Sequence, residues 1–145
     1  MFTILGFYKF KELKSLKKNK LFLQKLFKDN NIKGTLIISK EGINGTISGK
    51  SRSISLANRK IKSLFGILNF DSENVSVNKF QPFHRPKIKI KKEVVPMGLN
   101  ISPKIKKENH IDPTKWNNLI KNRNTFILDA RKPFEYQIGS CKKAI

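Results

Sequence analysis

Residues 35–49 read TLIISKEGINGTISG, and this stretch decides the fold. Thr35–Ser39 is short, apolar and rich in β-branched side chains, which predicts a strand. The Glu41–Gly45 connection contains Asn-Gly, a pair that tolerates positive φ and permits a hairpin-like reversal, so a neighbouring strand can begin over Gly45–Ser48. Two adjacent strands joined by a tight turn are therefore expected here.

An amphipathic helix is expected on each side of this strand pair. Upstream, apolar residues recur at three- and four-residue steps between lysines from Lys11 to Asp29. Downstream, a Ser-rich start at Ser51 precedes a similar pattern that stops near Gly66. The apolar positions are Leu13, Leu16, Leu23, Leu26 and Phe27 in the first helix and Ile54, Leu56, Ile61, Leu64 and Phe65 in the second.

Two outer strands complete the predicted domain. Residues 2–8, FTILGFY, suit a first strand, and Val75 and Val77 alternate with polar neighbours in a fourth. Strand, helix, strand, strand, helix, strand is the order of an α+β, ferredoxin-like (acylphosphatase-like) split βαβ domain, in which two helices cover one face of an antiparallel sheet. An uncovered face that carries lysines is a reasonable surface for RNA, although this fold hosts many unrelated functions.

The chain is strongly basic. Lys and Arg total 31 against 10 Asp and Glu in 145 residues, which gives a formal charge of +21 and a pI near 10.3. Self-repulsion of this size favours a polyanionic partner, with nucleic acid ahead of an anionic membrane surface. The alternative is compositional drift in an AT-rich genome, which raises Lys, Asn, Ile and Phe together.

Basic and apolar residues alternate from Arg85 to Lys91. In an extended chain the basic side chains then share one face, where a row of cations can track a phosphate backbone. The alternative is a solvated edge strand, because edge lysines also block unwanted strand pairing. The candidates for phosphate contact are Arg85, Lys87, Lys89, Lys91 and Lys92.

The connection after Ser39 is a second candidate for RNA contact. Lys40 supplies charge, and Asn44 offers a donor and an acceptor to a base edge or a ribose hydroxyl. The alternative is a purely structural turn, shaped by Glu41, Gly42 and Gly45, with the Asn in the left-handed region. Tyr8, Phe80 and Phe83 are candidates for base stacking, although core packing is the commoner role of such aromatics.

A second unit is expected after a linker. Residues 1–95 form the predicted first domain, and 96–110 contain the Pro, Gly, Ser and Asn punctuation of a linker. Asp112-Pro113 then opens a helix, and Thr125–Leu128 forms a strand. The pattern has changed to alternating α/β.

Metal, disulfide and membrane roles are not expected. Cys141 is the one cysteine, so the chain can form no internal disulfide and no multi-cysteine metal site. His84 has no second ligand at a convincing spacing. The apolar run at the N-terminus is too short for a signal peptide, and no segment approaches the roughly 20 apolar residues that span a bilayer. A cytoplasmic protein with no bound cofactor is expected.

Three ordered stretches resemble one family, the rhodanese-related tRNA uridine hydroxylases. SKEGINGTISG at residues 39–49 is similar to the Glu-Gly-Ile-Asn signature of their first domain. PFHRPKIKIKKEVVPMG at residues 82–98 resembles their basic strand followed by Lys-Glu-Ile-Val. FILDARKPFEYQIGSCKKAI at residues 126–145 looks like the opening of a rhodanese domain. The resemblance covers almost the whole chain.

The resemblance implies hydroxylation of a wobble uridine in tRNA to 5-hydroxyuridine, with molecular oxygen as co-substrate and tRNA as partner. It also implies that residues 111–145 are the first part of a rhodanese-like domain, and that the family's catalytic cysteine lies beyond Ile145. No catalytic residue is therefore expected within this chain, and Cys141 is interpreted as non-catalytic, because reactivity depends on the surroundings of a thiol. Asp129, Arg131 and Glu135 are expected to organise the rhodanese-like loop, since a buried acid and base at this spacing can pair.

Two other functions remain open. One is a non-catalytic RNA-binding module made from the front half of such an enzyme. The other is a sulfurtransferase of the ordinary rhodanese type, which is disfavoured because a plain rhodanese has no use for a basic first domain.

Overall fold

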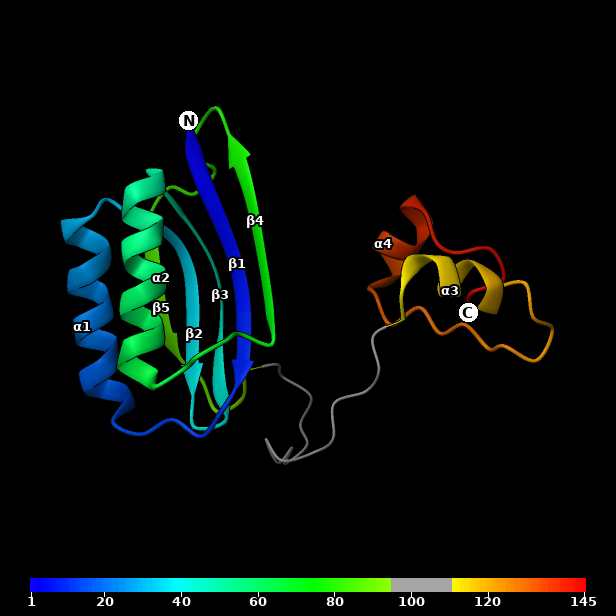
Figure 1. The fold of residues 1–145 in the computed structure, drawn as a ribbon, viewed down its shortest axis with the longest axis horizontal. Helices are drawn as coiled ribbons and strands as arrows, with labels where there is room; N and C mark the ends of the chain where they lie inside the picture. Colours follow the sequence, from blue (N-terminus) through cyan, green and yellow to red (C-terminus); the bar gives the residue numbers. More distant parts are fainter. Residues whose placement is uncertain (95–110) are drawn as a thin grey trace. The chain divides into compact units, whose positions relative to one another are not determined.

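The computed structural model describes residues 1–94 and 111–145, which belong to two compact units, Met1–Ile105 and Lys106–Ile145. The expected linker at 96–110 lies outside the described residues. The first unit contains a five-stranded sheet with two helices against it, and the second contains two short helices (Figure 1).

The sheet has the predicted split βαβ arrangement, extended by one parallel strand. The strand order is β4-β1-β3-β2-β5, with β2 and β5 parallel and the other neighbours antiparallel. In Figure 1, α1 and α2 lie together on one face of this sheet. The elements are β1 (Phe2–Phe10), α1 (Leu16–Asp29), β2 (Lys33–Ser39), β3 (Gly42–Gly49), α2 (Ser51–Phe65), β4 (Ser72–Asn78) and β5 (Pro86–Ile90).

The core lies between the two helices and the face of the sheet that they cover. Alternate residues of β1, β2 and β3, with Ile88 of β5, point into it, as the period of two in a β-strand requires, whereas Val75 and Val77 of the edge strand β4 stay exposed. Among the helices of the described residues, none combines the length and the apolar character needed to cross a membrane. The most deeply buried side chains include Leu5, Leu23, Phe27, Ile32, Leu36, Ile38, Ile43, Ile47 and Ile61.

The first helix starts later than predicted, at Leu16 rather than near Lys11. Backbone N–H groups of Lys11 and Leu13 instead donate to the carbonyls of Glu41 and Lys40 at 3.0 and 2.9 Å. Ser15 then adopts a left-handed φ of 54°, which a continuous helix cannot contain. Tertiary hydrogen bonds therefore override the apolar periodicity over this first turn.

The predicted Asn-Gly turn is wrong. The chain reverses at Lys40–Glu41, and β3 already begins at Gly42. Asn44 and Gly45 are paired strand residues, with Ile37 and Leu36 as their Cα partners on β2. The Asn-Gly pair is compatible with a reversal, but the cross-strand register places the reversal four residues earlier, at Lys40–Glu41.

The second unit has α3 (Pro113–Leu119) and α4 (Pro133–Ile138). Asp112 caps α3 by accepting a hydrogen bond from Thr114 N at 2.9 Å, as the Asp-Pro signal predicts. The strand expected at Thr125–Leu128 is not present, since 111–145 contain no strand. There, Ile145 N donates to Ile127 O, and Asp129 N donates to Ile145 O. Two hydrogen bonds to a single residue do not make a β-ladder.

Candidate nucleic-acid interface

The face of the sheet opposite the helices is left uncovered by the described residues. Leu5 and Phe7 of β1 are buried against the helices, so the even-numbered residues of β1 and their cross-strand partners point the other way. Two rows cross this face. The Tyr8 row consists of Ser72, Tyr8, Asn44, Ile37 and Lys89, and the Gly6 row consists of Asn74, Gly6, Thr46, Thr35 and Lys87.

Each row is free of carboxylates and ends in a lysine on β5. Nearby acidic side chains are held elsewhere: Asp71 Oδ1 accepts from Lys9 Nζ at 2.8 Å, and Glu73 Oε2 accepts from Lys62 Nζ of α2 at 3.0 Å. The uncovered face therefore carries hydroxyls, amides and cations, a set that suits the phosphates, riboses and base edges of RNA.

Aromatic side chains of β1 lie on the same face. Tyr8 and Phe10 are in edge-to-face contact, with ring centroids 6.0 Å apart, and Lys50 Nζ lies 5.7 Å from the centroid of Phe2. All three rings are half-buried and outside the core cluster. Aromatic rings on the surface of a sheet are the side chains on which proteins stack unpaired bases.

The aromatics named from the sequence do not join the core. Tyr8 and Phe83 are half-buried, Phe80 is exposed, and none of them belongs to the core cluster. The alternative that these aromatic side chains pack in the core is therefore wrong for all three. Phe2 and Phe10 were not singled out from the sequence, although strict alternation along FTILGFYKF with Leu5 and Phe7 inside would have indicated them.

Chain segments bound the uncovered face at both ends. At one end, Gln81 Nε2 donates to Ser48 O at 3.1 Å and to Asn31 O at 3.2 Å, which fixes the chain between β4 and β5. At the other end, Glu41 Oε1 accepts from Val94 N at 2.5 Å. The two rows lie between these fixed points.

The basic strand forms as predicted and runs along the sheet edge as β5. Lys87 and Lys89 pair with Thr35 and Ile37 and so share the uncovered face, whereas Ile88 pairs with Leu36 and is buried. Lys91 N donates to Ile38 O at 3.1 Å, which continues the pairing beyond the strand. The cationic row is thus aligned by backbone pairing.

The remaining predicted RNA contacts occupy the margins. Arg85 precedes β5 and is exposed, and its carbonyl accepts from Gly34 N at 3.2 Å. Lys40 is exposed in the β2–β3 turn next to Glu41. Lys92 is exposed two residues before Val94, which binds Glu41, so Lys40 and Lys92 lie at the same end of the sheet. Asn44 is half-buried within the Tyr8 row rather than in a loop.

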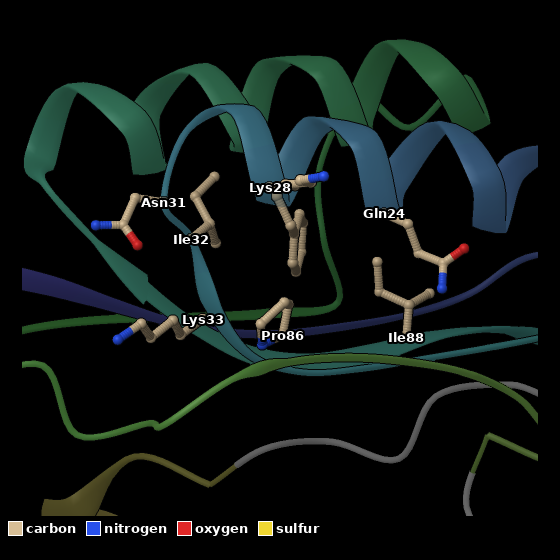
Figure 2. Close-up of a pocket in the computed structure, with 8 residues that line it drawn as sticks. Gln24, Lys28, Asn31, Ile32, Lys33, Pro86 and Ile88 are labelled. Atoms are coloured by element: carbon tan, nitrogen blue, oxygen red, sulfur yellow. The ribbon is translucent and has the colours of Figure 1, made fainter.

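A pocket of about 360 Å³ lies at the sheet edge between α1 and β5. Figure 2 shows Gln24 and Lys28 of α1 on one side and Pro86 and Ile88 of β5 on the other, with Asn31, Ile32 and Lys33 at the helix end. Its apolar floor includes Phe27. Lys28 and Lys33 extend the positive charge of the β5 edge toward α1.

In the second unit hydrogen bonds join Asp129 to Arg131, whereas Glu135 bonds to the backbone of Lys132. Arg131 donates through Nε and Nη2 to the two Asp129 carboxylate oxygens, at 2.9 and 2.6 Å, and through Nη2 to Gly139 O at 2.6 Å. Glu135 Oε2 accepts from Lys132 N at 3.1 Å. The Asp129–Arg131 pair is only partly buried, since the Asp129 side chain is 10% exposed and the Arg131 side chain 48% exposed.

This pairing shifts the pKa values of both Asp129 and Arg131. The hydrogen bond from Arg131 holds the pKa of Asp129 below its ordinary value, and the hydrogen bond to Asp129 raises the pKa of Arg131. Each shift favours the charged form of the group. The two residues therefore fix the turn after Ile127 as an ion pair.

Cys141 is exposed and lines a shallow pocket of about 520 Å³ with Trp116, Asp129 and Arg131. His84 is exposed. Within 1–94 and 111–145, no three His, Cys, Asp or Glu side chains are placed to hold a metal ion.

Comparison with known proteins agrees with this architecture. Residues 2–94 match the family described as the UPF0176 acylphosphatase like domain. A Pelagibacter ubique protein named tRNA uridine(34) hydroxylase is 58% identical over all of this chain and 48% of its own length. A Bartonella bacilliformis protein of the same name is 36% identical over 99% of this chain and 47% of its own length.

Among solved structures, acylphosphatase from Bacillus subtilis aligns with a TM-score of 0.45 and 11% identity, over 61% of this chain and 99% of that one. The chain spans about half the length of the curated relatives it matches. With the family match extending over residues 2–94 of 145, the chain belongs to the UPF0176 family and carries its acylphosphatase-like domain.

Proposed function

We propose that this chain is the RNA-binding part of a cytoplasmic enzyme that hydroxylates the wobble uridine of tRNA to 5-hydroxyuridine, with molecular oxygen as co-substrate. The relatives that support this carry the name tRNA uridine(34) hydroxylase and match the chain from end to end. On this proposal the described residues hold tRNA, and no residue of the chain is assigned to the oxidation itself.

The observation that carries the proposal is the alignment of Lys87 and Lys89 with two carboxylate-free rows. Phosphate contacts position an RNA without reading its sequence, whereas hydroxyls, amides and aromatic rings contact riboses and bases. Lys87 and Lys89 supply the first kind of contact, and Asn44, Thr46 and Tyr8 supply the second. Arg85, Lys91 and Lys92 would continue the phosphate row, and Lys40 would add charge at one end.

Binding of purified tRNA to the full chain at a series of salt concentrations tests this proposal. Because each phosphate contact releases counterions, affinity is expected to fall steeply with salt. The double variant Lys87→Gln with Lys89→Gln is expected to weaken binding and to reduce the slope of log affinity against log salt by about 2.

A matched control removes the same charge from the other side of the domain. Arg59→Gln with Lys60→Gln changes two exposed residues of α2, and is expected to leave most of the affinity intact. Equal losses in the two double variants would mean that overall charge, rather than the β5 row, binds tRNA. A salt-independent affinity would contradict phosphate contact altogether.

The enzymatic part of the proposal needs a longer protein. In cells without their own hydroxylase, the matching part of the Pelagibacter ubique relative is replaced by this chain, and wobble 5-hydroxyuridine is measured by mass spectrometry of tRNA. The chimera is expected to restore the modification, and the Lys87→Gln, Lys89→Gln chimera to restore less. A stable chimera that yields no 5-hydroxyuridine, beside an active parent, would contradict the proposal.

A further inference from the structure

We propose that Gly6 is the floor of a seat for one unpaired nucleobase on the uncovered face of the sheet. The inference rests on the proposed RNA binding and deepens it, because it names the part of the RNA that is recognised. The seat is bounded along β1 by Ile4 and Tyr8, and across the sheet by Thr46 on β3 and Asn74 on β4.

Gly6 has no steric reason to be glycine. A Cβ at Gly34 or Gly42 would lie 2.2 Å from a backbone oxygen, and both residues have φ values in the region that favours glycine. The φ of Gly6 is outside that region, and a Cβ there would meet Thr46 Oγ1 alone, at an ordinary 3.6 Å. Glycine inside a strand is destabilising, and it marks places where a ligand or another backbone approaches closely.

The missing side chain leaves open space above the Gly6 backbone, here called the hollow, because an added Cβ would have only Thr46 Oγ1 within 4 Å. Thr46 is directly opposite Gly6 on the central strand β3, and it is the one exposed residue of that strand. Asn74, on the other side of Gly6, is also exposed. A planar ring can lie against the Gly6 backbone with its edges toward these two polar side chains.

The chemistry around the hollow selects a nucleobase. The Thr46 hydroxyl and the Asn74 amide can each donate and accept, as a base edge requires. Tyr8 is the next residue on the same face of β1 and offers a ring for stacking. Lys87 stands at the end of the Gly6 row, so a phosphate of the bound RNA would meet a cation there.

Filling the hollow tests the seat. The full chain and its Gly6→Val variant are titrated with two probes of equal nucleotide count, an RNA stem-loop with an unpaired loop and a blunt RNA duplex. Gly6→Val is expected to weaken stem-loop binding about tenfold, the loss of one stacked base, and to leave duplex binding unchanged. The melting temperature is expected to rise, because valine suits a strand better than glycine.

The matched controls add one methyl group to each face. Gly6→Ala is expected to weaken stem-loop binding by a smaller factor, whereas Gly49→Ala, on the covered face with contacts of 3.5 Å or more, leaves it unchanged. Asn74→Ala removes an exposed amide and is expected to weaken stem-loop binding alone. It keeps the test decisive if Gly6→Val fails to fold.

Three outcomes overturn the seat. The first is wild-type affinity of folded Gly6→Val for the stem-loop. The second is an equal loss on both RNAs, because a duplex has no unpaired base to seat. The third is an unchanged stem-loop affinity in Asn74→Ala. If the unmodified chain binds neither RNA, the proposed function fails, and the seat fails with it.

Discussion

Glu41 and Val94 are joined by a hydrogen bond of 2.5 Å from Val94 N to Glu41 Oε1. Val94 is 2% exposed, so its N–H has no ready access to water. Glu41→Ala leaves this donor unpaired and is expected to lower the free energy of unfolding by about 1–3 kcal/mol. Urea denaturation followed by circular dichroism measures the difference.

The amide variant separates the hydrogen bond from the charge. Glu41→Gln keeps an acceptor oxygen at the same place and is expected to lose less stability than Glu41→Ala. Amide hydrogen exchange should show faster exchange of Val94 N–H in the alanine variant. Equal stability of Glu41→Ala and the unmodified chain would show that this bond does not hold the segment after β5.

Gly45 is predicted to be required by packing. A Cβ on Gly45 would lie 2.7 Å from Leu36 Cδ1 and 2.9 Å from Thr35 O. Gly45→Ala is therefore expected to cost about 1–3 kcal/mol through overpacking. Thermal denaturation compares it with Gly49→Ala, whose added methyl group has room; similar melting temperatures for the two variants would contradict this.

The β2–β3 turn shows which features of this fold the sequence pattern predicts and which it does not. TLIIS and its neighbour were predicted as paired strands, and they are β2 and β3. The reversal was expected at the Asn-Gly pair, yet it lies at Lys40–Glu41. Register depends on cross-strand packing rather than on turn composition alone, and a change of register moves a side chain such as that of Asn44 between loop and sheet.

The candidate interface was predicted only along one strand. Alternation placed Lys87 and Lys89 on a common face, which β5 confirms. Their alignment with Asn44, Thr46 and Gly6 depends on a parallel pairing with β2, between residues about fifty positions apart in the sequence. Such pairing is nonlocal, so no local sequence pattern could have shown that Lys87 and Lys89 stand at the ends of the Gly6 row and the Tyr8 row.

The Asp129–Arg131 pair makes the second unit sensitive to acid. The pKa of Asp129 is lowered from 3.8 by the hydrogen bond from Arg131. A depressed carboxyl pKa stabilises the folded form above the unfolded value of about 3.8, and this contribution disappears as the pH falls through the folded pKa. The effect is small because about half of the Arg131 side chain is exposed to solvent, which screens the pair.

Carboxyl NMR measures this titration directly. Asp129 is expected to titrate below 3.8, and Arg131→Gln to return its midpoint toward 3.8. An unchanged Asp129 midpoint in Arg131→Gln would exclude the ion pair as the cause.

Asn44 offers a test of recognition separate from charge. Asn44 is a half-buried residue of β3 on the uncovered face. Its Cα partners are Tyr8 on β1 and Ile37 on β2. Its amide can contact a base edge or a ribose hydroxyl. Asn44→Ala is therefore expected to weaken tRNA binding about tenfold with an unchanged salt slope, since no phosphate contact is lost. The melting temperature should stay nearly constant; a large fall without a change in affinity would assign Asn44 to the fold instead.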